Sequence, residues 1–283
     1  MLAPRELPRA FAEWNHKYKA PFGSKWWTRL LGSKWFGIGS IRYTRMLVWK
    51  YRTRWPSWVI RSIGPFGFQT NSATRIYEYP WAYYATPLGN GCLRAVDVGS
   101  GASGFQFVLA SAGIRVVSVD PLINPSESVN WRFSIDDFHR LNRAFGARVK
   151  FICDLLEAAH LESDNYDRIF AISVLEHIPW GPLKELVREI ARILKPGGYF
   201  VATIDLFLDC YPFTKKEANE YGGNISVKDL IEASGLQLVF GEPSDLCGFA
   251  EFSPEAVIRR KDDYLVVNNV MTQCIVMQKN QKE

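Results

Sequence analysis

Apolar positions from about residue 93 onward follow two alternating patterns. Short runs rich in β-branched residues are typical of buried parallel strands, and longer stretches with apolar residues every three or four positions are typical of helices. The predicted strands are Leu93–Val98, Arg115–Val119, Val149–Cys153, Arg168–Ile172, Tyr199–Ile204, Leu236–Phe240 and Tyr264–Met277. The predicted helices between them are Phe105–Ala112, Ile135–Phe145, Pro182–Leu194 and Val227–Ser234. This alternation is typical of an α/β protein.

A proline–glycine segment separates the third of these helices from the strand after it. Lys195-Pro196-Gly197-Gly198 follows the helical pattern directly, and proline with paired glycines is a strong helix stop. We therefore predict that the helix ends at this segment and that the fifth strand begins at Tyr199.

The first 90 residues lack the alternation. Short helices are predicted at Glu6–Tyr18 and Ile41–Arg54, although basic residues in the second point in nearly every direction. Pro56, Gly64-Pro65 and Gly67 then break the chain repeatedly. We predict a helical N-terminal extension over residues 1–90 and an α/β domain over residues 91–283.

Charge and cysteine content restrict the class of protein. Residues 1–75 hold 14 Lys/Arg against two acids, and eight of the ten tryptophans lie before residue 82, so the extension differs in composition from the rest. No stretch reaches the roughly 18 apolar residues of a membrane span, and the N-terminus lacks the apolar run of a secretory signal. Five widely spaced cysteines without a C-x-x-C pair favour reduced thiols and a cytoplasmic location over a zinc site or disulfides.

The most informative segment is a glycine-rich turn between the first strand and the first helix after it. Gly99, Gly101 and Gly104 match the G-x-G-x-x-G pattern of NAD and FAD sites, a weak signal when taken alone. Asp97 stands two residues before the first glycine, where its carboxylate would repel a pyrophosphate. A sulfonium cofactor carries two cationic centres, so the carboxylate favours that ligand over a dinucleotide.

A second acid, Asp120, ends the strand Arg115–Val119, immediately before Pro121. An acid at this position can accept hydrogen bonds from two ribose hydroxyls, one on each carboxylate oxygen. Its spacing of 19 residues from Gly101 suits that role in both NAD and methyltransferase sites. The alternative is a solvated acid at a strand end.

The turn resembles the first motif of class I S-adenosylmethionine-dependent methyltransferases, D-x-G-x-G-x-G, with Ser103 in place of the third glycine. Two further segments resemble motifs of the same family in the same order. They are Tyr166–Ile178, at the fourth strand, and Lys195–Tyr199, before the fifth. The resemblance covers roughly residues 75–280. It implies a Rossmann-like, seven-stranded, mostly parallel sheet whose last strand runs antiparallel beside Leu236–Phe240, with S-adenosyl-L-methionine as cofactor.

The resemblance also implies a set of cofactor contacts. Asp154 would accept a hydrogen bond from the adenine amino group, and the main-chain amide of Leu155 would contact the ring. Arg75 would pair with the methionine carboxylate of the cofactor or with an anionic acceptor. The full cofactor-binding set is Arg75, Asp97, Gly99, Ser100, Gly101, Asp120, Pro121, Asp154, Leu155, Ile172 and Ser173.

The candidate catalytic residues are His177, Glu176 and Asp205. Methyl transfer is an in-line displacement that depends on positioning, and a hydroxyl or protonated amine acceptor must also lose a proton. His177 is the first candidate base, because it follows the fourth strand and histidine titrates near neutral pH. The alternative is that Glu176-His177 only ties the helix to its neighbours.

A metal-assisted reaction is a weaker alternative. Glu176-His177 is similar to the end of the E-x-x-E-H metal site of ubiquinone-pathway O-methyltransferases, but Ser173 replaces the first glutamate. Asp205 or Asp209 could substitute for it in space. We expect no metal.

The sequence favours an active methyltransferase for a small or medium-sized metabolite, with O- or N-methylation preferred to C-methylation. A non-catalytic binding or membrane-associated protein that keeps the fold is the second hypothesis, and an NAD-binding oxidoreductase the third.

The segment Arg75–Tyr84, with four tyrosines and a tryptophan, suggests that residues 1–90 form a cap over the cofactor cleft and shape the acceptor pocket. A membrane surface ranks second as the partner of the basic extension, and nucleic acid ranks third.

Overall fold

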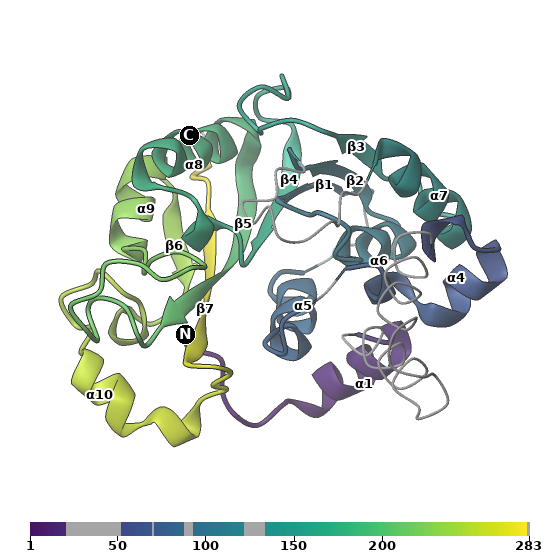
Figure 1. The fold of residues 1–283 in the computed structure, drawn as a ribbon. Helices are drawn as coiled ribbons and strands as arrows, with labels where there is room; N and C mark the ends of the chain where they lie inside the picture. Colours follow the sequence, from purple (N-terminus) through teal and green to yellow (C-terminus); the bar gives the residue numbers. More distant parts are fainter. Residues whose placement is uncertain (21–51, 70, 88–92, 122–133, 282–283) are drawn as a thin grey trace, which may run out of the picture.

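The computed structural model describes residues 1–20, 52–69, 71–87, 93–121 and 134–281. The described residues form a seven-stranded sheet in the order β3-β2-β1-β4-β5-β7-β6 (Figure 1). The strands are β1 Arg94–Val98, β2 Arg115–Val119, β3 Lys150–Ile152, β4 Tyr166–Ile172, β5 Leu194–Phe207, β6 Gln237–Phe240 and β7 Val270–Gln278. All pairings among β1 to β5 are parallel, whereas β7 runs antiparallel to both β5 and β6. The predicted fold class and the antiparallel last strand are therefore confirmed.

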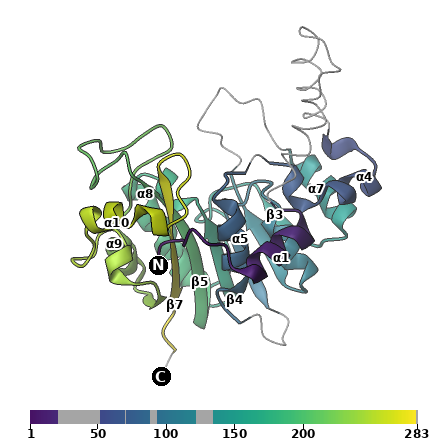
Figure 2. The ribbon, with the colours of Figure 1, turned by 90° about the horizontal axis from the view of Figure 1, so that it is seen from below.

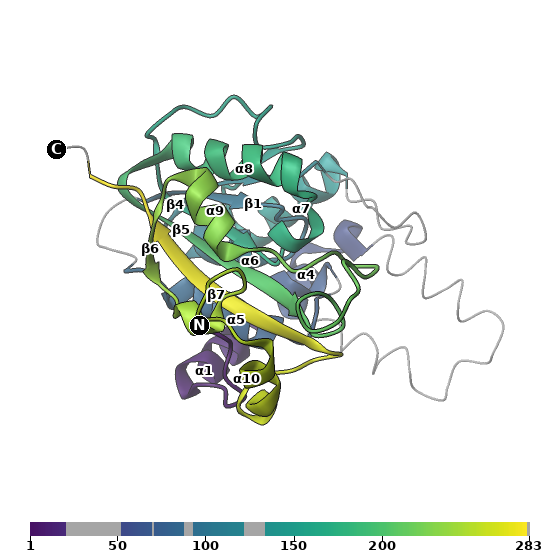
Figure 3. The same cartoon turned by 90° about the vertical axis from the view of Figure 1, so that its left-hand side faces the viewer.

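Helices cover both faces of the sheet (Figure 1). The helices of the described residues are α1 Arg9–Tyr18, α4 Ser57–Ile63, α5 Arg75–Tyr84, α6 Phe105–Ser111, α7 Ile135–Phe145, α8 Trp180–Ile193, α9 Val227–Ser234 and α10 Pro254–Arg259. Apolar side chains of α1, α4, α5, α6 and α7 share one buried cluster with one face of the sheet. Those of α8 and α9, which lie side by side in Figure 3, share a second cluster with the other face.

The central strands are apolar almost throughout because both of their faces are buried, whereas the edge strands β3 and β6 are partly or largely exposed. On β4, Ile169 and Ala171 belong to the cluster of α8 and α9, and Phe170 and Ile172 belong to the opposite cluster. Successive side chains of a strand point to opposite faces, so a strand covered on both sides has no polar face to present. This explains the continuous apolar runs from which the strands were predicted.

The proline–glycine segment departs from the prediction. Helix α8 ends at Ile193 and strand β5 begins at once at Leu194, so Lys195–Gly198 lie within the strand. The pairing with β4 slips there, since Tyr166 is opposite Leu194 whereas Arg168 is opposite Tyr199. Gly197 has a φ of +74°, which glycine adopts without steric cost. The glycines therefore form an irregularity inside the strand instead of a turn before it.

The last strand is shorter at its start than predicted. It begins at Val270 instead of Tyr264. Asn268 and Asn269 both adopt positive φ angles, of +51° and +62°. On either side of them, the Val267 N–H donates to the Val270 carbonyl at 3.0 Å and the Val270 N–H donates to the Val267 carbonyl at 2.9 Å. Asparagine tolerates this left-handed conformation, so the residues before Val270 form a tight turn.

The N-terminal segment is packed against the domain. Helix α1 begins at Arg9, after Pro8, instead of at the predicted Glu6. Before it, the Ala3 N–H donates to the Thr272 carbonyl at 2.9 Å, so the first residues run along β7 (Figure 2). Of the predicted helix Ile41–Arg54, only Arg52–Arg54 are described, and they form a 3₁₀ turn; the rest lies outside the described residues.

Within the part of the chain that the structure describes, no helix is both long enough and apolar enough to cross a bilayer.

Candidate functional site

The glycine-rich turn lies at the carboxyl end of β1, beside the ends of β2 and β4. Gly99, Gly101 and Gly104 have φ angles of +64°, +47° and +97°. A Cβ on Gly99 would lie 2.6 Å from Val174 Cγ1, and one on Gly104 would lie 2.5 Å from the Pro65 carbonyl oxygen. Side chains are therefore excluded at these positions by backbone conformation and by close packing.

Gly104 occupies the place of the displaced third glycine. It precedes α6 directly, while Ser103 turns its hydroxyl toward the same helix and donates to Gln106 Oε1 at 3.1 Å. The turn thus accommodates the Ser103 side chain, and the position that is too close to a neighbouring backbone for a side chain is Gly104.

A cavity of about 50 Å³ opens at this turn. Six of the predicted cofactor residues line it together: Arg75, Asp97, Gly99, Ser100, Ile172 and Ser173. They come from α5, from the end of β1 and from the end of β4, so the fold brings distant parts of the sequence to one place. The remaining lining residues are Gln69, Tyr79, Val98, Ser103 and Phe105.

Two polar groups at the cavity have no partner among the described residues. Asp97 is only 3% exposed, and its Oδ2 atom accepts no hydrogen bond; the Ser100 hydroxyl is in the same situation. Burial, and secondarily the nearby Asp120 carboxylate, raise the pKa of Asp97 well above its usual value. A buried carboxyl group without a donor is costly, so this site suits a ligand that brings donors or positive charge.

Asp120 fastens the turn to the next strand. Its Oδ2 atom accepts a hydrogen bond from the Gly101 N–H at 2.7 Å. The carboxylate therefore stands at the carboxyl end of β2, against the glycine turn, as the sequence predicted.

Three predicted cofactor residues lie away from the cavity. Asp154 and Leu155 follow β3 and are exposed, and the Asp154 Oδ1 atom accepts the Leu155 N–H at 2.8 Å. Pro121 is partly buried, with the Cys153 Sγ atom 3.9 Å from its carbonyl oxygen. These residues sit together at the ends of β2 and β3, and their assignment to the adenine end stays a prediction.

Sequence reasoning missed Gln69. Its Oε1 atom accepts the Ala102 N–H at 2.7 Å and lies 2.5 Å from where a Cβ on Gly101 would be. The side chain therefore lies against the glycine turn and forms part of the cavity wall. A lone glutamine in an irregular segment carries no sequence signal, so only the tertiary structure identifies it.

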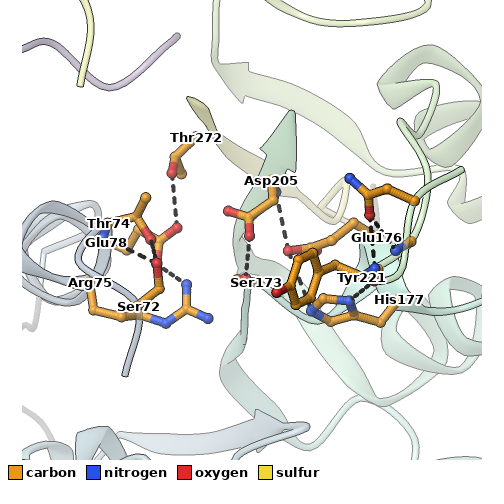
Figure 4. Close-up of polar contacts among 12 residues, drawn as sticks. Ser72, Thr74, Arg75, Glu78, Ser173, Glu176, His177, Asp205, Tyr221 and Thr272 are labelled. Atoms are coloured by element: carbon orange, nitrogen blue, oxygen red, sulfur yellow. Dashed lines mark hydrogen bonds and ion pairs between the residues drawn. The ribbon is translucent and has the colours of Figure 1, made fainter. Parts of the chain in front are cut away.

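Arg75 lies in the cavity wall but is held by a partner. It forms a buried ion pair with Glu78, whose side chain is fully buried and whose Oε1 atom accepts the Thr272 hydroxyl at 3.0 Å (Figure 4). Burial alone would lower the pKa of Arg75, but Glu78 outweighs it and raises that pKa. Glu78 was not among the predicted site residues, although it lies within the aromatic segment singled out for the acceptor pocket.

The three candidate catalytic residues gather around the end of β4. The Ser173 hydroxyl donates to Asp205 Oδ2 at 3.1 Å, and the Asp205 N–H donates to Glu176 Oε1 at 3.2 Å (Figure 4). Glu176 Oε2 and Asp205 Oδ1 are shielded from solvent and have no hydrogen-bond partner among the described residues. Burial raises the pKa of Glu176 to about 7 and, together with the Glu176 carboxylate, raises that of Asp205 well above its usual value.

His177 lies at the edge of this cluster, with its side chain 41% exposed. Its Nδ1 atom contacts the Tyr221 carbonyl oxygen, which can only accept, so Nδ1 carries the proton. Nε2 of the neutral ring is then the basic nitrogen, 4.0 Å from Glu176 Oε1.

The acid Asp209, considered as a metal ligand, points elsewhere. Its carboxylate accepts hydrogen bonds from Asn219 at 3.0 Å and from Lys216 at 3.1 Å. In the five described stretches of chain, no three His, Cys, Asp or Glu side chains are grouped so as to hold a metal ion.

Comparison with known families agrees with this fold. A family model described as "Methyltransferase domain" matches residues 96–202, from β1 through most of β5. The matched segment is therefore similar to a methyltransferase domain, and the seven-stranded sheet with its glycine turn has the Rossmann-like fold found in S-adenosylmethionine-dependent methyltransferases.

The individual relatives differ in their described chemistry. The chain is 28% identical over 109 residues to the sterol 4-C-methyltransferase strm-1 of Caenorhabditis elegans, covering 38% of this chain and 30% of that protein. It is 29% identical over 122 residues to a ubiquinone biosynthesis O-methyltransferase of Methylocella silvestris, covering 43% of each. The matched segments thus span less than half of either relative. The crystal structure of the [4+2]-cyclase SpnF aligns with a TM-score of 0.53 at 15% identity, covering 82% of this chain and 94% of that one. At that identity the likeness shows the fold alone.

Proposed function

We propose that this chain is an active S-adenosylmethionine-dependent methyltransferase that acts on a small or medium-sized molecule. The observation that carries the proposal is the buried Oδ2 atom of Asp97, which has no hydrogen-bond partner among the described residues and lies beside a glycine turn held by Asp120. S-adenosyl-L-methionine supplies an electrophilic methyl group on a cationic sulfur, together with an ammonium group. Both charges favour a site with two nearby carboxyl groups, whereas a dinucleotide pyrophosphate would be repelled.

The residues around the cavity fit this cofactor. Asp97 and Ser100 offer unused polar atoms to its methionine end, and the glycine turn leaves bare backbone for close approach. Asp120 would hold the ribose hydroxyls, and Pro121, Asp154 and Leu155 the adenine. For the cofactor to enter, the Gln69 side chain must leave the turn.

Three proton acceptors beside Ser173 favour an O- or N-acceptor over carbon. A hydroxyl or ammonium group must lose a proton during or before transfer, and Glu176, Asp205 and His177 are within or beside one cluster. A non-catalytic binding protein would retain the glycine turn but has no use for this cluster, which is why we rank it second.

We also propose that the N-terminal 90 residues cap the cofactor cleft, in a protein of the cytoplasm. Gln69, Arg75 and Tyr79 all come from this region and all line the cavity. The Tyr79 ring stacks on Phe105 at 5.6 Å between centroids, which joins the region to the helix that follows the glycine turn.

The direct test is calorimetry with S-adenosylhomocysteine, followed by a screen for its release from S-adenosyl-L-methionine with candidate acceptors. Micromolar binding and acceptor-dependent release are expected. Binding without release for any acceptor would favour the non-catalytic alternative, and an absence of binding would contradict the proposal.

Replacing Asp120 by alanine is expected to weaken binding of S-adenosylhomocysteine by about 1–3 kcal/mol. The change removes the proposed ribose contacts. It also removes the hydrogen bond that the Gly101 N–H donates to Asp120 Oδ2. Isothermal titration calorimetry measures the effect, and Asp136→Ala, on the exposed first turn of α7, is the control. An unchanged dissociation constant would remove Asp120 from the site.

Replacing His177 by alanine or glutamine is expected to lower turnover by roughly tenfold to a hundredfold while cofactor affinity stays nearly intact. The reason is that the ring offers Nε2 as a base at the edge of the carboxyl cluster, away from the glycine turn. The rate of S-adenosylhomocysteine release and its dissociation constant are measured in parallel. If the rate is unchanged, His177 is structural.

A further inference from the structure

We propose that the methyl acceptor is an amine, and that Asp205, Glu176 and Ser173 bind its nitrogen. This inference rests on the proposed methyltransferase function and assigns a chemical class to the acceptor.

In the described part of the chain, carboxyl groups outnumber cationic groups around this cluster. Glu176 and Glu78 both raise the pKa of Asp205. The guanidinium of Arg75 acts on Asp205 and Glu176, but it is already paired with Glu78. Asp205 and Thr272 are directly opposite each other on β5 and β7, and Thr272 donates to Glu78. Asp205 therefore lies on the same side of the sheet as Thr272 and Glu78, and in the described residues Asp205 and Glu176 share a single guanidinium that is already paired with Glu78.

Among the described residues, two carboxyl oxygens of the cluster are unused hydrogen-bond acceptors. Glu176 is 3% exposed. Its Oε2 atom and the Oδ1 atom of Asp205 are both shielded from solvent, and neither has a hydrogen-bond partner in the described structure. Leaving a buried acceptor unsatisfied costs about 1–3 kcal/mol, more when it is charged. A primary ammonium supplies three donors and one positive charge, so it satisfies both atoms and restores the charge balance. A hydroxyl group supplies one donor and no charge.

The cluster also lies where an acceptor must lie. Ser173 joins the two parts of the site, because it lines the cavity at the glycine turn and donates to Asp205. A nitrogen held by Asp205 and Glu176 would therefore stand beside the cavity that Ser173 lines.

The chemical step balances with the groups present. The bound ammonium gives one proton to the Asp205–Glu176 pair and becomes a neutral amine with a free electron pair. That pair attacks the methyl carbon, the N–C bond forms and the C–S bond breaks, with its electrons remaining on sulfur. The products are a methylated ammonium and S-adenosylhomocysteine, and the proton leaves the carboxyl pair when the product departs. The raised pKa of Glu176, about 7, suits a group that takes up and releases a proton near neutrality.

The test measures binding of matched probes to the protein saturated with S-adenosylhomocysteine. The probes are ethanolamine, hexylamine and 2-phenylethylamine, each paired with the alcohol that carries –OH in place of –NH2. We expect at least one amine to bind tenfold or more tightly than its alcohol in titration calorimetry. Asp205→Asn and Glu176→Gln should each remove that preference while the affinity for S-adenosylhomocysteine is retained.

Asp209→Asn is the matched control, because Asp209 lies four residues beyond Asp205 and is held by Lys216 and Asn219 on the outside of the cluster. It should keep the preference for amines. Equal affinity for amine and alcohol in every pair, or no response to any amine, would overturn the inference, and this comparison needs only the unmodified protein. Failure to bind S-adenosylhomocysteine would instead contradict the proposed function itself.

Discussion

Replacing Gly222 by alanine is expected to lower the free energy of unfolding by at least about 2 kcal/mol and to reduce turnover. Gly222 has a φ of +144°, a conformation that residues with a side chain rarely adopt. A Cβ there would lie 2.9 Å from the Glu176 carbonyl carbon and closer still to its oxygen. The new methyl group must therefore displace backbone, which cannot yield as a flexible side chain can.

The displaced backbone belongs to the site. The Gly223 N–H donates to the Glu176 carbonyl at 3.3 Å, and the Tyr221 carbonyl contacts His177. Moving this segment would shift both candidate bases. Urea denaturation and the rate of S-adenosylhomocysteine release measure the two effects.

Gly181→Ala is the control for this experiment. Gly181 lies in the first turn of α8, and no atom is within 4 Å of its added Cβ. Alanine is expected there to be neutral or slightly stabilising. A Gly222→Ala protein that is as stable and as active as the Gly181→Ala protein would show that the segment moves without consequence for the site.

Replacing Glu176 by glutamine is expected to flatten the pH dependence of stability between pH 5 and pH 8. Burial raises the pKa of Glu176 from 4.5 to about 7, so in this window the folded protein holds a proton that the unfolded chain has lost. Stability from this group is present below pH 4.5 and is lost as the pH rises through 7. The loss from pH 5 to pH 8 is about 2–3 kcal/mol.

Glutamine cannot ionise, so the variant should gain stability relative to the parent at pH 8 and little at pH 5. The charged groups near Glu176 are Arg75 on α5, Asp205 on β5 and the adjacent His177. Chemical denaturation at the two pH values measures the difference, and Glu185→Gln, an exposed acid on α8, is the control. An equal change in unfolding free energy at both pH values would show that Glu176 is ionised in the folded protein at pH 5.

The sequence determined the sheet and the glycine turn. The central strands are continuous apolar runs because both of their faces are buried, and α7 and α9 carry apolar residues at helical spacing. Both signals are local, so β2, α7 and α9 were predicted to the residue. Asp97 and Asp120 were placed correctly because the carboxyl ends of neighbouring parallel strands meet at one edge of the sheet. Glycine at Gly99 and Gly101 follows from the positive φ angles that the turn demands.

Only the tertiary structure decided what surrounds that turn. Gln69 reaches Ala102 across 33 positions of sequence, and Thr272 reaches Glu78 across 194, so no local pattern reports either contact. The Asp205–Glu176 pair exists because β4 and β5 are neighbours in register, with Ile172 opposite Thr203. Residue propensities and the spacing of apolar positions predict the local structure of each segment. Which side chains share a buried space depends on the packing of segments that are distant in sequence, and it is this packing that raises the pKa of Glu176 and Asp205.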